Sequence, residues 1–552
     1  MAMQYMVIVE CISSGILYVD EIISRGYKPL VINAKNPTED ALNYRRIVAQ
    51  RYSDRIEFID EKEDFDEFIE DLKKYEIVAA FPGAETGVRL ADRIVKALDL
   101  RGNDPETTYL RCNKAGMYEA LGKAGIRRIE SAHVHSDDDI ISFWNEHQLQ
   151  TCVMKFAETA GTVGLKICKT LEDAIDYYKV LQDMPTFFGE VHADVLIQEY
   201  IDGTEYIINT LSCNGEHMLT DMWVYAKIRA EDGTLAYDYT KLVKELEPGH
   251  SDAIRYVYSV LDAVDMKWGL CHTEIKIDRK GPVLIETNAR PMGLAMTQSY
   301  LDEALGHHQT DLALTVYLDP TRFERMKVKP YRPRKYALMK LMIVPEDIRG
   351  SFAPTFVISN MIRSTREILF FGLEGVSSYH RTIDLETSPL TIKMINEDYG
   401  ELMRDYEMIR LIESNYFHLF YSLGEKVESC DHRSNIGGIL RHLDPARRYL
   451  IVKDGTEYVG QYGKIEKNED NWQIYDGVIY AESGETVAEE RYRAMFRSMY
   501  GVRSGGYCVV VPESYTNLKS GSVVVEFLMN LAGVEVIAPP YDSVGIIIGQ
   551  KK

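Results

Sequence analysis

The sequence predicts a multidomain protein that combines α/β and α+β architecture. Its 552 residues are too many for one hydrophobic core, and 45% of them are apolar, which is ordinary for a globular protein. Strand-like and helical patterns alternate over the first hundred residues, which is typical of a parallel α/β sheet, whereas consecutive strands dominate later segments. We therefore expect three or four domains or subdomains.

The first domain, expected over residues 1–110, is a small parallel α/β domain. Its predicted strands and helices lie at 5–9, 29–33 and 77–81 and at 16–25 and 88–98. Glu85 follows the third strand, at the edge of the sheet where α/β domains collect ligands, so it is a candidate substrate contact. Capping of the following helix is an equal alternative for this carboxylate.

A second region, expected over residues 111–330, begins with a predicted helix at 111–130. A smaller α+β unit of about 130–200 follows, with strands at 151–156, 164–168 and 194–200 and a helix at 171–182. The rest of this region is predicted to contain strands at 205–211 and 218–225, a helix at 250–265, a hairpin, and a helix at 301–317. Residues 322–335 carry seven basic residues, and we interpret them as a connector rather than a polyanion-binding arm.

Two further domains are expected after that connector. Residues 331–417 predict a β-rich subdomain, with strands near 336–344, 366–372 and 375–382 and a helix at 397–413. Residues 418–552 predict an additional α/β domain, with strands at 447–452, 472–480 and 506–511, a helix at 485–500, and apolar segments at 523–531 and 534–540. Residues 418–552 contain no metal-binding, nucleophile or phosphate-binding signature, so their sequence does not indicate a role for this domain.

The amino-acid composition indicates which kinds of molecule the protein is not expected to bind. The formal net charge of −22, from 63 basic and 85 acidic residues, disfavours nucleic acid. Eight cysteines without a C-x-x-C pair favour reduced thiols over a disulfide or zinc framework. The start of the sequence lacks a basic signal-peptide region, and no apolar run approaches the ~18–20 residues of a membrane span. We expect a cytoplasmic protein without a membrane or nucleic-acid partner.

The most informative segment is a predicted hairpin that ends in a cluster of polar residues. Two strand-like runs, 274–278 and 282–286, are joined by a turn sequence, Asp278-Arg-Lys-Gly281. Glu286, Asn288 and Arg290 are two residues apart, so on an extended backbone their side chains point to one face.

Folding of this hairpin would bring Glu274 beside Glu286 and Asn288. Two carboxylates and an amide oxygen are hard ligands that suit Mg²⁺, with Mn²⁺ as an alternative. Arg290 can neutralise an anionic intermediate by bidentate contacts. The alternative is a solvated hairpin with a charged face. We disfavour it because Pro291-Met-Gly293 is poor strand material and indicates a shaped loop.

The E…E-x-N-x-R pattern of this hairpin resembles the metal-binding signature of ATP-grasp carboxylate ligases. The preceding Cys271-His-Thr-Glu274 and the following Pro291-x-Gly293 resemble most the branch that contains bacterial L-amino-acid (dipeptide) ligases. The resemblance covers roughly residues 1–417. It implies a Rossmann-like N-terminal domain, an ATP-grasp clamp over 111–330 with its lid at about 130–200, and a β-rich subdomain that completes the ligase.

Two lysines and a glycine loop resemble the nucleotide site of this family. Lys155 ends a strand and is followed by Gly161-Thr162-Val-Gly164, so one ammonium and several backbone N–H groups could surround a phosphate chain. A short glycine loop alone also suits an ordinary hairpin turn. With the hairpin, it resembles the family's lysine strand and flexible loop over the ATP phosphates. Lys114 matches the other nucleotide-binding lysine, with a surface helix lysine as the alternative.

The strand end Glu199-Tyr200-Ile201, followed by an acidic turn that ends at Glu205, resembles the hinge of the ATP clamp. The resemblance implies that backbone groups of residues 199–201 read the adenine edge and that Glu199 or Glu205 binds ribose or metal-side groups. An acidic turn without function is the alternative. Lys227 lies where family members often carry a basic residue near the γ-phosphate.

The sequence signals for substrate-binding residues are less specific than those for the nucleotide site. His272 is a lone histidine in an apolar strand, where a satisfied core histidine is the common case. Its place in the H-T-E string implies that it faces the acyl substrate, and we keep both interpretations. Glu85 and Gly293 are the other predicted substrate contacts. The pair His307-His308 is interpreted as surface.

The resemblance implies an ADP-forming carbon–nitrogen ligase that uses ATP and Mg²⁺. A carboxylate, implied to be that of an amino acid, is activated as an acyl phosphate and joined to an amine, with Arg290 stabilising the oxyanion. Partners would be small-molecule amino-acid or carboxylate and amine substrates, and we expect a homo-oligomer. The sequence after residue 418 departs from dipeptide ligases, which leaves loading of a carrier-protein thiol as an alternative. A non-catalytic ATP-binding scaffold is disfavoured because the sequence retains both predicted metal carboxylates, Glu274 and Glu286. A biotin-carboxylase-type reaction is disfavoured by the H-T-E string at residues 272–274.

Overall fold

A computed structural model forms two compact units. One contains Met1–Met339, Ile383–Glu386 and Ile395–Tyr399, and the other contains Lys340–Thr382, Thr387–Met394 and Gly400–Lys552. All the predicted site residues belong to the first unit, and the domain boundaries proposed from the sequence remain predictions. The structure describes residues 3–37, 39–52, 55–157, 163–186, 191–229, 235–293, 296–344, 348–349, 362–370, 378–383, 385, 387–411 and 413, and seven strands between 449 and 551.

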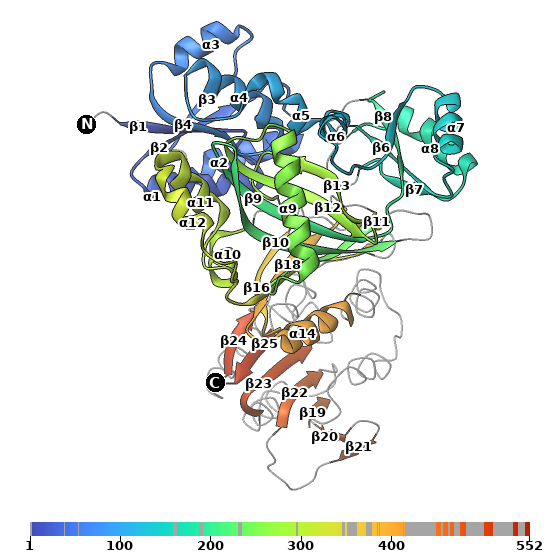
Figure 1. Ribbon diagram of the computed structural model, residues 1–552. Helices are drawn as coiled ribbons and strands as arrows, with labels where there is room; N and C mark the ends of the chain where they lie inside the picture. The colour runs from blue at the N-terminus through green and yellow to red at the C-terminus, as the bar shows by residue number, and fades with distance from the viewer. Residues whose placement is uncertain are drawn as a thin grey trace. The chain divides into compact units, whose positions relative to one another are not determined.

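The N-terminal sheet confirms the predicted parallel α/β domain (Figure 1). Its strand order is β3-β2-β1-β4, and all pairings are parallel. The strands are β1 (Gln4–Val9), β2 (Lys28–Asn33), β3 (Glu57–Asp60) and β4 (Glu76–Pro82), and the helices are α1 (Leu17–Ser24), α2 (Glu39–Tyr52), α3 (Phe65–Leu72) and α4 (Val88–Ala97). The sequence analysis missed β3, α2 and α3. Strand β3 is short and only half-buried, so it lacks the apolar run by which a strand is recognised.

Alternation along β1 builds apolar cores on both faces of this sheet. Met6 and Ile8 pack with residues of α1 and of a later helix, α11 (Gln309–Leu318). Val7 and Val9 pack with residues of α3 and α4 on the other face. The N-terminal sheet therefore shares a continuous core with an element that follows the candidate site in sequence.

The central sheet carries the candidate site. Its strands follow the order β13-β12-β9-β10-β11 and continue to β14. They are β9 (Thr204–Cys213), β10 (Glu216–Arg229), β11 (Leu235–Leu242), β12 (Gly269–Asp278), β13 (Gly281–Asn288) and β14 (Tyr336–Leu341). Helix α9 (Pro248–Ala263) lies across one face, where Val257 and Val260 pack with Ile208 and Ile275 (Figure 1).

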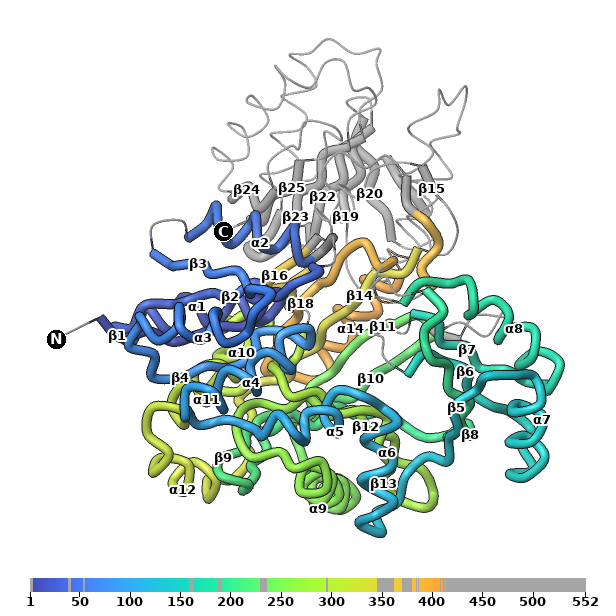
Figure 2. The backbone as a smooth tube through the Cα atoms, turned by 90° about the horizontal axis from the view of Figure 1, so that it is seen from above, coloured from blue at the N-terminus to red at the C-terminus, as the bar shows by residue number. Residues whose placement is uncertain are grey.

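A smaller sheet with two helices forms the predicted lid unit. The strand order is β5-β8-β6-β7, and the pairings are antiparallel. The elements are β5 (Ser131–Val134), α7 (Asp137–Glu146), β6 (Cys152–Phe156), β7 (Lys166–Cys168), α8 (Leu171–Asp183) and β8 (Val195–Glu199). Figures 1 and 2 show this lobe on one side of the central sheet, with the N-terminal domain on the other.

Two predicted helices are each split in the structure. The helix predicted at 111–130 is α5 (Tyr109–Cys112) and α6 (Lys114–Lys123), because Asn113 adopts an extended conformation and its side chain accepts from Gly116 N at 3.1 Å. The helix predicted at 301–317 is α10 (Gln298–Ala304) and α11, which are separated by Gly306 at φ +90°. Lys114 thus becomes the first residue of its own capped helix.

The surface interpretation of the histidine pair was wrong. The His308 side chain is 12% exposed, and it contacts Asp302 at 2.9 Å and Glu21 of α1 at 3.2 Å. His307 Nε2 lies 3.0 Å from the carbonyl oxygen of Thr220. Both rings therefore join the segment before α11 to neighbouring elements of the first unit.

The second unit is rich in strands. Its elements before residue 414 are β15 (Ile348–Arg349), β16 (Thr365–Phe370), β17 (Ser378–Tyr379), most of β18 (Leu390–Asn396) and most of α14 (Tyr399–Leu411). A mixed seven-stranded sheet follows, in the order β21-β20-β19-β22-β23-β25-β24. Its strands are β19 (Tyr449–Lys453), β20 (Thr456–Gln461), β21 (Lys464–Lys467), β22 (Tyr475–Ala481), β23 (Val502–Val511), β24 (Val534–Ala538) and β25 (Ile547–Lys551). The helix predicted at 485–500 and the apolar segment at 523–531 lie outside the described residues.

None of the helices in the described parts of the chain combines the length and the apolar character that crossing a bilayer requires.

Candidate active site

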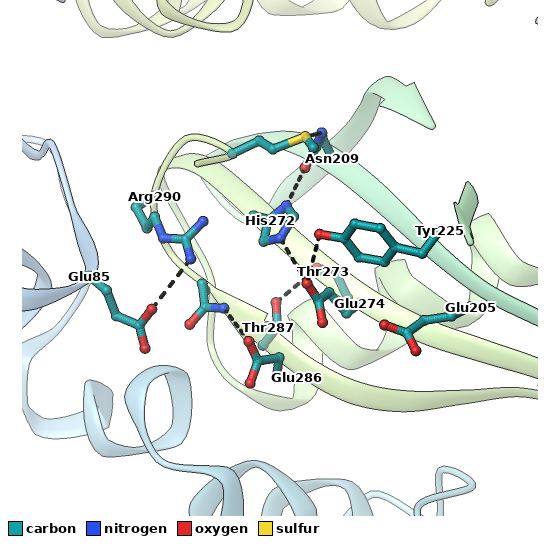
Figure 3. Close-up of polar contacts among 12 residues, drawn as sticks. Glu85, Glu205, Asn209, Tyr225, His272, Thr273, Glu274, Glu286, Thr287 and Arg290 are labelled. Carbon is teal, nitrogen blue, oxygen red and sulfur yellow. Dashed lines mark hydrogen bonds and ion pairs between the residues drawn. The ribbon is translucent and has the colours of Figure 1, made fainter. Parts of the chain in front are cut away.

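The predicted hairpin is confirmed, and its register brings the acidic residues together. Strands β12 and β13 pair antiparallel, with Glu274 directly opposite Glu286 and His272 opposite Asn288. The register shifts between Glu274 and Ile275, so the strand is irregular next to the first carboxylate. Figure 3 shows His272, Glu274 and Glu286 close together on the hairpin.

Glu286 is a largely buried carboxylate that is held in its ionised form. Lys114 Nζ, at the start of α6, lies 2.7 Å from Glu286 Oε2, and Asn288 Nδ2 donates to Oε1 at 3.1 Å. Burial alone would raise the pKa of Glu286, but the charges of Lys114 and Lys155 and the bond from Asn288 lower it to about 2. Lys114 is buried too, and Glu286 raises its pKa above the ordinary value of 10.5 against the effect of burial.

Glu274 is held by two hydrogen bonds to its Oε1 atom. Tyr225 of β10 donates at 3.2 Å, and His272 Nε2 lies at 3.3 Å (Figure 3). Burial acts to raise the pKa of Glu274, yet the contact with His272 brings it below the ordinary value. Two ionised carboxylates therefore face each other across the hairpin.

Lys227 and Glu205, both predicted as nucleotide contacts, pair with each other. Lys227 Nζ lies 2.6 Å from Glu205 Oε1, and both side chains are largely buried. The ammonium also lies 4.3 Å from the centroid of the Tyr237 ring and 5.1 Å from that of Tyr225. Burial opposes the charge of Lys227, but Glu205 and Tyr237 raise its pKa. This pair stands next to Glu274 through the shared neighbour Tyr225.

Lys155 of β6 is a buried cation that the described residues leave without a counter-ion. It is 4% exposed, and its Nζ lies 6.0 Å from the centroid of the Tyr118 ring. Burial and the neighbouring charge of Lys114 lower the pKa of Lys155 to about 7. No hydrogen bond or ion pair joins it to a residue whose placement is described. An anion at this position would restore its charge.

The glycine loop after Lys155 is described only at its end. Gly161 and Thr162 lie outside the described residues, so their predicted role stays a prediction. Gly164 has φ +71°, and a Cβ added there would lie 2.4 Å from the ring of Phe156. The turn that leads from the loop into β7 therefore requires glycine.

Gly164→Ala is expected to destabilise the lid by at least about 1 kcal/mol, because alanine is strained at positive φ and must displace Phe156. Thermal unfolding measures the effect, and the melting temperature should fall. The matched control is Gly249→Ala in α9, where an added Cβ meets nothing within 4 Å. An unchanged melting temperature for Gly164→Ala would contradict the assignment of this turn.

The predicted hinge connects the lid to the hairpin. Glu199 Oε1 accepts from Glu130 N at 3.2 Å, and Lys276 Nζ donates to the carbonyl oxygen of Ile201 at 3.0 Å and lies 5.2 Å from the ring centroid of Tyr200. Ile201 also packs in an apolar cluster with Ile129 and Val283, which brings residues beside β5 and β8 against β13. Residues 199–201 thus lie at the junction between the lid and the central sheet.

Arg290 joins the end of the hairpin to the N-terminal domain. Its Nη2 donates to Glu85 Oε2 at 3.3 Å, and its Nη1 donates to the carbonyl oxygen of Pro291 at 3.1 Å (Figure 3). Glu85 begins the short 3-10 helix η2 (Glu85–Gly87), and burial raises its pKa although Arg290 acts against this. Gly293 lies beyond, where a Cβ would meet nothing within 4 Å.

Other polar residues near the site were missed by the sequence analysis. Asn209 of β9 and Asp221 and Tyr225 of β10 are buried or half-buried and contact the site directly or through one another. They belong to no recognised motif. Their only sequence signal is a polar residue within a strongly apolar strand, which by itself also fits a satisfied core residue.

Comparisons with known proteins agree with this geometry. Residues 149–298, which include Lys155, the hinge and the hairpin, match the ATP-grasp domain family. Dapdiamide A synthase of Enterobacter agglomerans is 29% identical over 361 residues, which are 63% of this chain and 82% of that protein.

Solved structures show the same fold. An L-amino acid ligase from Bacillus licheniformis aligns with a TM-score of 0.56 at 16% identity, and the alignment covers 74% of this chain and 97% of that one. A carboxyaminoimidazole ribonucleotide synthase from Aspergillus clavatus, complexed with ATP, aligns with a TM-score of 0.54 at 16% identity over 73% and 97% of the two chains. The lysine strand, the hinge and the acidic hairpin thus all lie within the segment of this chain that matches the ATP-grasp domain family.

Proposed function

We propose that the protein is an ATP-dependent ligase that activates the carboxylate of an amino acid as an acyl phosphate and joins it to an amine. One observation carries the proposal: Glu274 and Glu286 face each other at one end of the hairpin, within reach of buried lysines and next to the Arg290–Glu85 pair. The dapdiamide A synthase and L-amino acid ligase similarities support the same reaction class.

The residues present fit a magnesium ion. Among the described residues no group of three or more His, Cys, Asp and Glu side chains is arranged to hold a metal, so the donor set that we propose is two carboxylates, Glu274 and Glu286, with the amide oxygen of Asn288. Oxygen donors of this kind, completed by substrate phosphates, are what Mg²⁺ prefers. Once bound, the ion would neutralise phosphate charge during phosphoryl transfer.

We propose that ATP lies between the lid and the hairpin, along the face that carries Lys155. Lys155 pairs with Leu196 in the register of β6 and β8, so its side chain lies on the lid face opposite Met154 and Ile197, which pack with α7 and α8. Lys155 and Lys114 would bind phosphate oxygens, and the glycine loop would cover them. Residues 199–201 would contact the adenine, and Glu205 with Lys227 would lie towards the γ-phosphate.

The proposed reaction has two steps. A carboxylate oxygen of the first substrate attacks the γ-phosphorus of ATP, which forms the acyl phosphate and releases ADP. The neutral amine of the second substrate then attacks the acyl carbon, and the electron pair moves onto the carbonyl oxygen and returns as phosphate leaves, with the departing phosphate taking up the proton that the amine nitrogen releases. Arg290 would stabilise this oxyanion, while Glu85 would accept a hydrogen bond from the amine. Closure of the lid would keep water from the acyl phosphate.

Amino-acid-dependent ADP formation tests the function. Pairs of amino acids are screened for ADP release from ATP in the presence of Mg²⁺, and the products are identified by mass spectrometry. A condensation product with one ADP per bond supports the ligase. Binding of ATP without turnover for any pair indicates a scaffold, and turnover that requires a carrier protein indicates a thiol acceptor. The cytoplasmic location and the homo-oligomeric state remain predictions.

The pH dependence of ATP affinity should report on Lys155. Because its pKa is about 7 in the free protein, the ammonium form that binds phosphate is fully populated only below this value. The KM for ATP is therefore expected to rise as the pH increases from 6 to about 9, with uptake of a proton on binding.

Two variants separate this effect from other titrations. Lys155→Ala should raise the KM for ATP at every pH with little change in melting temperature. Lys155→Arg keeps a charge throughout this range and should flatten the pH profile. If Lys155→Ala lowers the melting temperature sharply and leaves ATP affinity intact, Lys155 is structural.

A further inference from the structure

The two carboxylates of the hairpin face each other because strand β13 contains one extra residue. From the turn as far as the pair Ile275–Leu284, the two strands follow the regular antiparallel register. If that register continued, Ile285 would lie opposite Glu274, and Glu286 would turn to the other face of the sheet. The register shifts instead, and Glu274 pairs with Glu286. Ile285 is therefore the additional residue of a β-bulge.

The packing of β13 on either side of the bulge agrees with this shift. Leu284 packs with residues of α9 on one face of the sheet. Thr287 lies on the same face, because its hydroxyl is 2.9 Å from the sulfur of Cys271, which belongs to the same apolar cluster. Residues on one face of a regular strand are two or four apart, whereas these are three apart. The bulge thus turns Glu286 to the face opposite α9, where Glu274 lies.

Two tyrosine hydroxyl groups hold the backbone at the bulge. Tyr118 of α6 is 1% exposed and donates to the carbonyl oxygen of Ile285 at 2.6 Å. Leu284 N donates to the hydroxyl of Tyr256 of α9 at 2.8 Å, and this hydroxyl donates to the carbonyl oxygen of Arg127 at 2.7 Å. Because β13 is the edge strand of its sheet, some of its backbone groups need partners other than a strand. Helices α6 and α9, which lie beside β13, supply them (Figure 1).

Helix α6 contacts both the bulge and the carboxylate that follows it. Lys114 and Tyr118 are four residues apart, so their side chains lie on the same face of the helix. Lys114 Nζ lies 2.7 Å from Glu286 Oε2, while the Tyr118 hydroxyl bonds to the preceding residue, Ile285. One face of α6 therefore holds the side chain of Glu286 and also the backbone that determines where this side chain points.

We propose that Tyr118 is a positioning residue of the ligase and that Tyr256 assists it. The Tyr118 hydroxyl holds the bulged backbone at Ile285 in the conformation that turns Glu286 towards Glu274, so that both carboxylates bind one metal ion. Tyr118 itself contacts neither carboxylate. The proposal rests on the ligase function and the metal assignment argued above, because the two carboxylates must lie together only if they share an ion.

Tyr118→Phe keeps the ring and removes only the hydroxyl. The buried carbonyl oxygen of Ile285 then lacks its donor, and the bulge can relax. We expect the Mg²⁺ concentration for half-maximal ADP formation to rise about 10–100-fold, as for other residues that support a metal ligand. ATP affinity measured without Mg²⁺ by titration calorimetry should change less than about 3-fold, because no contact proposed for ATP is removed.

Binding of Mn²⁺ provides a readout that needs no turnover. Electron paramagnetic resonance measures free Mn²⁺ with protein and saturating ATP, and a sample with ATP alone is the blank. The dissociation constant of Mn²⁺ should rise about 10–100-fold in Tyr118→Phe. Amide hydrogen exchange over residues 282–288 should also become faster, because the bulge is held less firmly.

Tyr256→Phe is the second variant and tests the other contact of the bulge. Leu284 N loses its acceptor, but Tyr256 is only half-buried, so water can replace its hydroxyl in part. The dissociation constant of Mn²⁺ should therefore rise by a smaller factor, about 3–10-fold. Faster hydrogen exchange is expected over the same residues, 282–288.

Tyr331→Phe is the matched control. The Tyr331 hydroxyl also joins two backbone groups of the central sheet, since it donates to the carbonyl oxygen of Val243 at 2.8 Å and accepts from Met222 N at 3.3 Å. Its loss should lower the melting temperature while the dependence on Mg²⁺ and Mn²⁺ stays unchanged.

The outcomes separate positioning from a merely structural role. The proposal is overturned if folded Tyr118→Phe keeps Mg²⁺ and Mn²⁺ constants within about 2-fold of normal, or if Tyr331→Phe shifts them equally. If Tyr118→Phe does not fold, an unchanged Mn²⁺ constant in folded Tyr256→Phe overturns it. If no amino-acid pair gives product with the unsubstituted protein, the ligase function fails, and Mn²⁺ binding still decides whether Tyr118 positions Glu286.

Discussion

Glu286→Gln is expected to lower the rate of ADP formation at least about 100-fold, the order expected when a contact to the metal or to transition-state charge is lost. The amide keeps the shape of the side chain but removes a charge that Lys114 and Asn288 hold ionised in the free protein. Lys114 also loses its counter-ion, so the melting temperature should fall modestly. The measurement is ADP formation at saturating Mg²⁺, ATP and substrates.

The control for Glu286→Gln is Glu216→Gln. Glu216 is an exposed carboxylate that also pairs with a lysine, Lys327, and its neutralisation should leave turnover unchanged. Near-normal turnover of folded Glu286→Gln at saturating Mg²⁺ would refute the metal assignment. A loss that increasing Mg²⁺ concentrations recover would instead show that Glu286 contributes to affinity for the ion only.

Sequence patterns predicted the elements that are determined by residues close together in the sequence. Period-two alternation and the Asp278–Gly281 turn predicted the hairpin, and a short turn leaves few alternative pairings, so Glu274 and Glu286 come close together. The apolar runs of β1, β2 and β4 predicted the parallel sheet for a similar reason, since a strand buried on both faces reads as a continuous apolar segment.

Capping and single-residue conformations were harder to predict. Asn113 divides a helical pattern by acting as the N-cap of α6, and Gly306 ends α10 at positive φ. Both signals are present in the sequence, but helical spacing on either side of each residue hides them. Strand β3 was missed because its half-buried residues lack the apolar run of its neighbours.

Pairings between distant residues could not be predicted. Lys114 meets Glu286, Lys227 meets Glu205, and Arg290 meets Glu85 only because the fold brings separate elements together. The sequence analysis predicted for each of these residues a contact with the metal ion, the nucleotide, a substrate or the reacting oxyanion, whereas in the free protein they pair with one another. Asp221 was not identified at all, because a buried acid that accepts only neutral donors has no spacing by which it can be recognised.

Arg290→Lys is expected to reduce amide formation about 100- to 1,000-fold, the range seen when one oxyanion contact is removed. Lysine keeps the charge but cannot offer two parallel N–H donors, and Arg290 already divides its donors between Glu85 and the carbonyl oxygen of Pro291. Arg127→Lys is the matched control. Arg127 pairs with Asp278 at 2.7 Å at the turn of the same hairpin, so its replacement should affect stability rather than chemistry.

Trapping with hydroxylamine decides which step depends on Arg290. Hydroxylamine converts an acyl phosphate into a hydroxamate without the second substrate, so hydroxamate formation reports the first step alone. If Arg290 stabilises the oxyanion of amine attack, Arg290→Lys should still consume ATP and form hydroxamate while the amide product falls. If Arg290 instead binds the carboxylate of the first substrate, hydroxamate and amide should fall together with a raised KM for that substrate. Normal amide formation by Arg290→Lys would exclude both roles, and the contact with Glu85 would then serve only to hold the N-terminal domain against the hairpin.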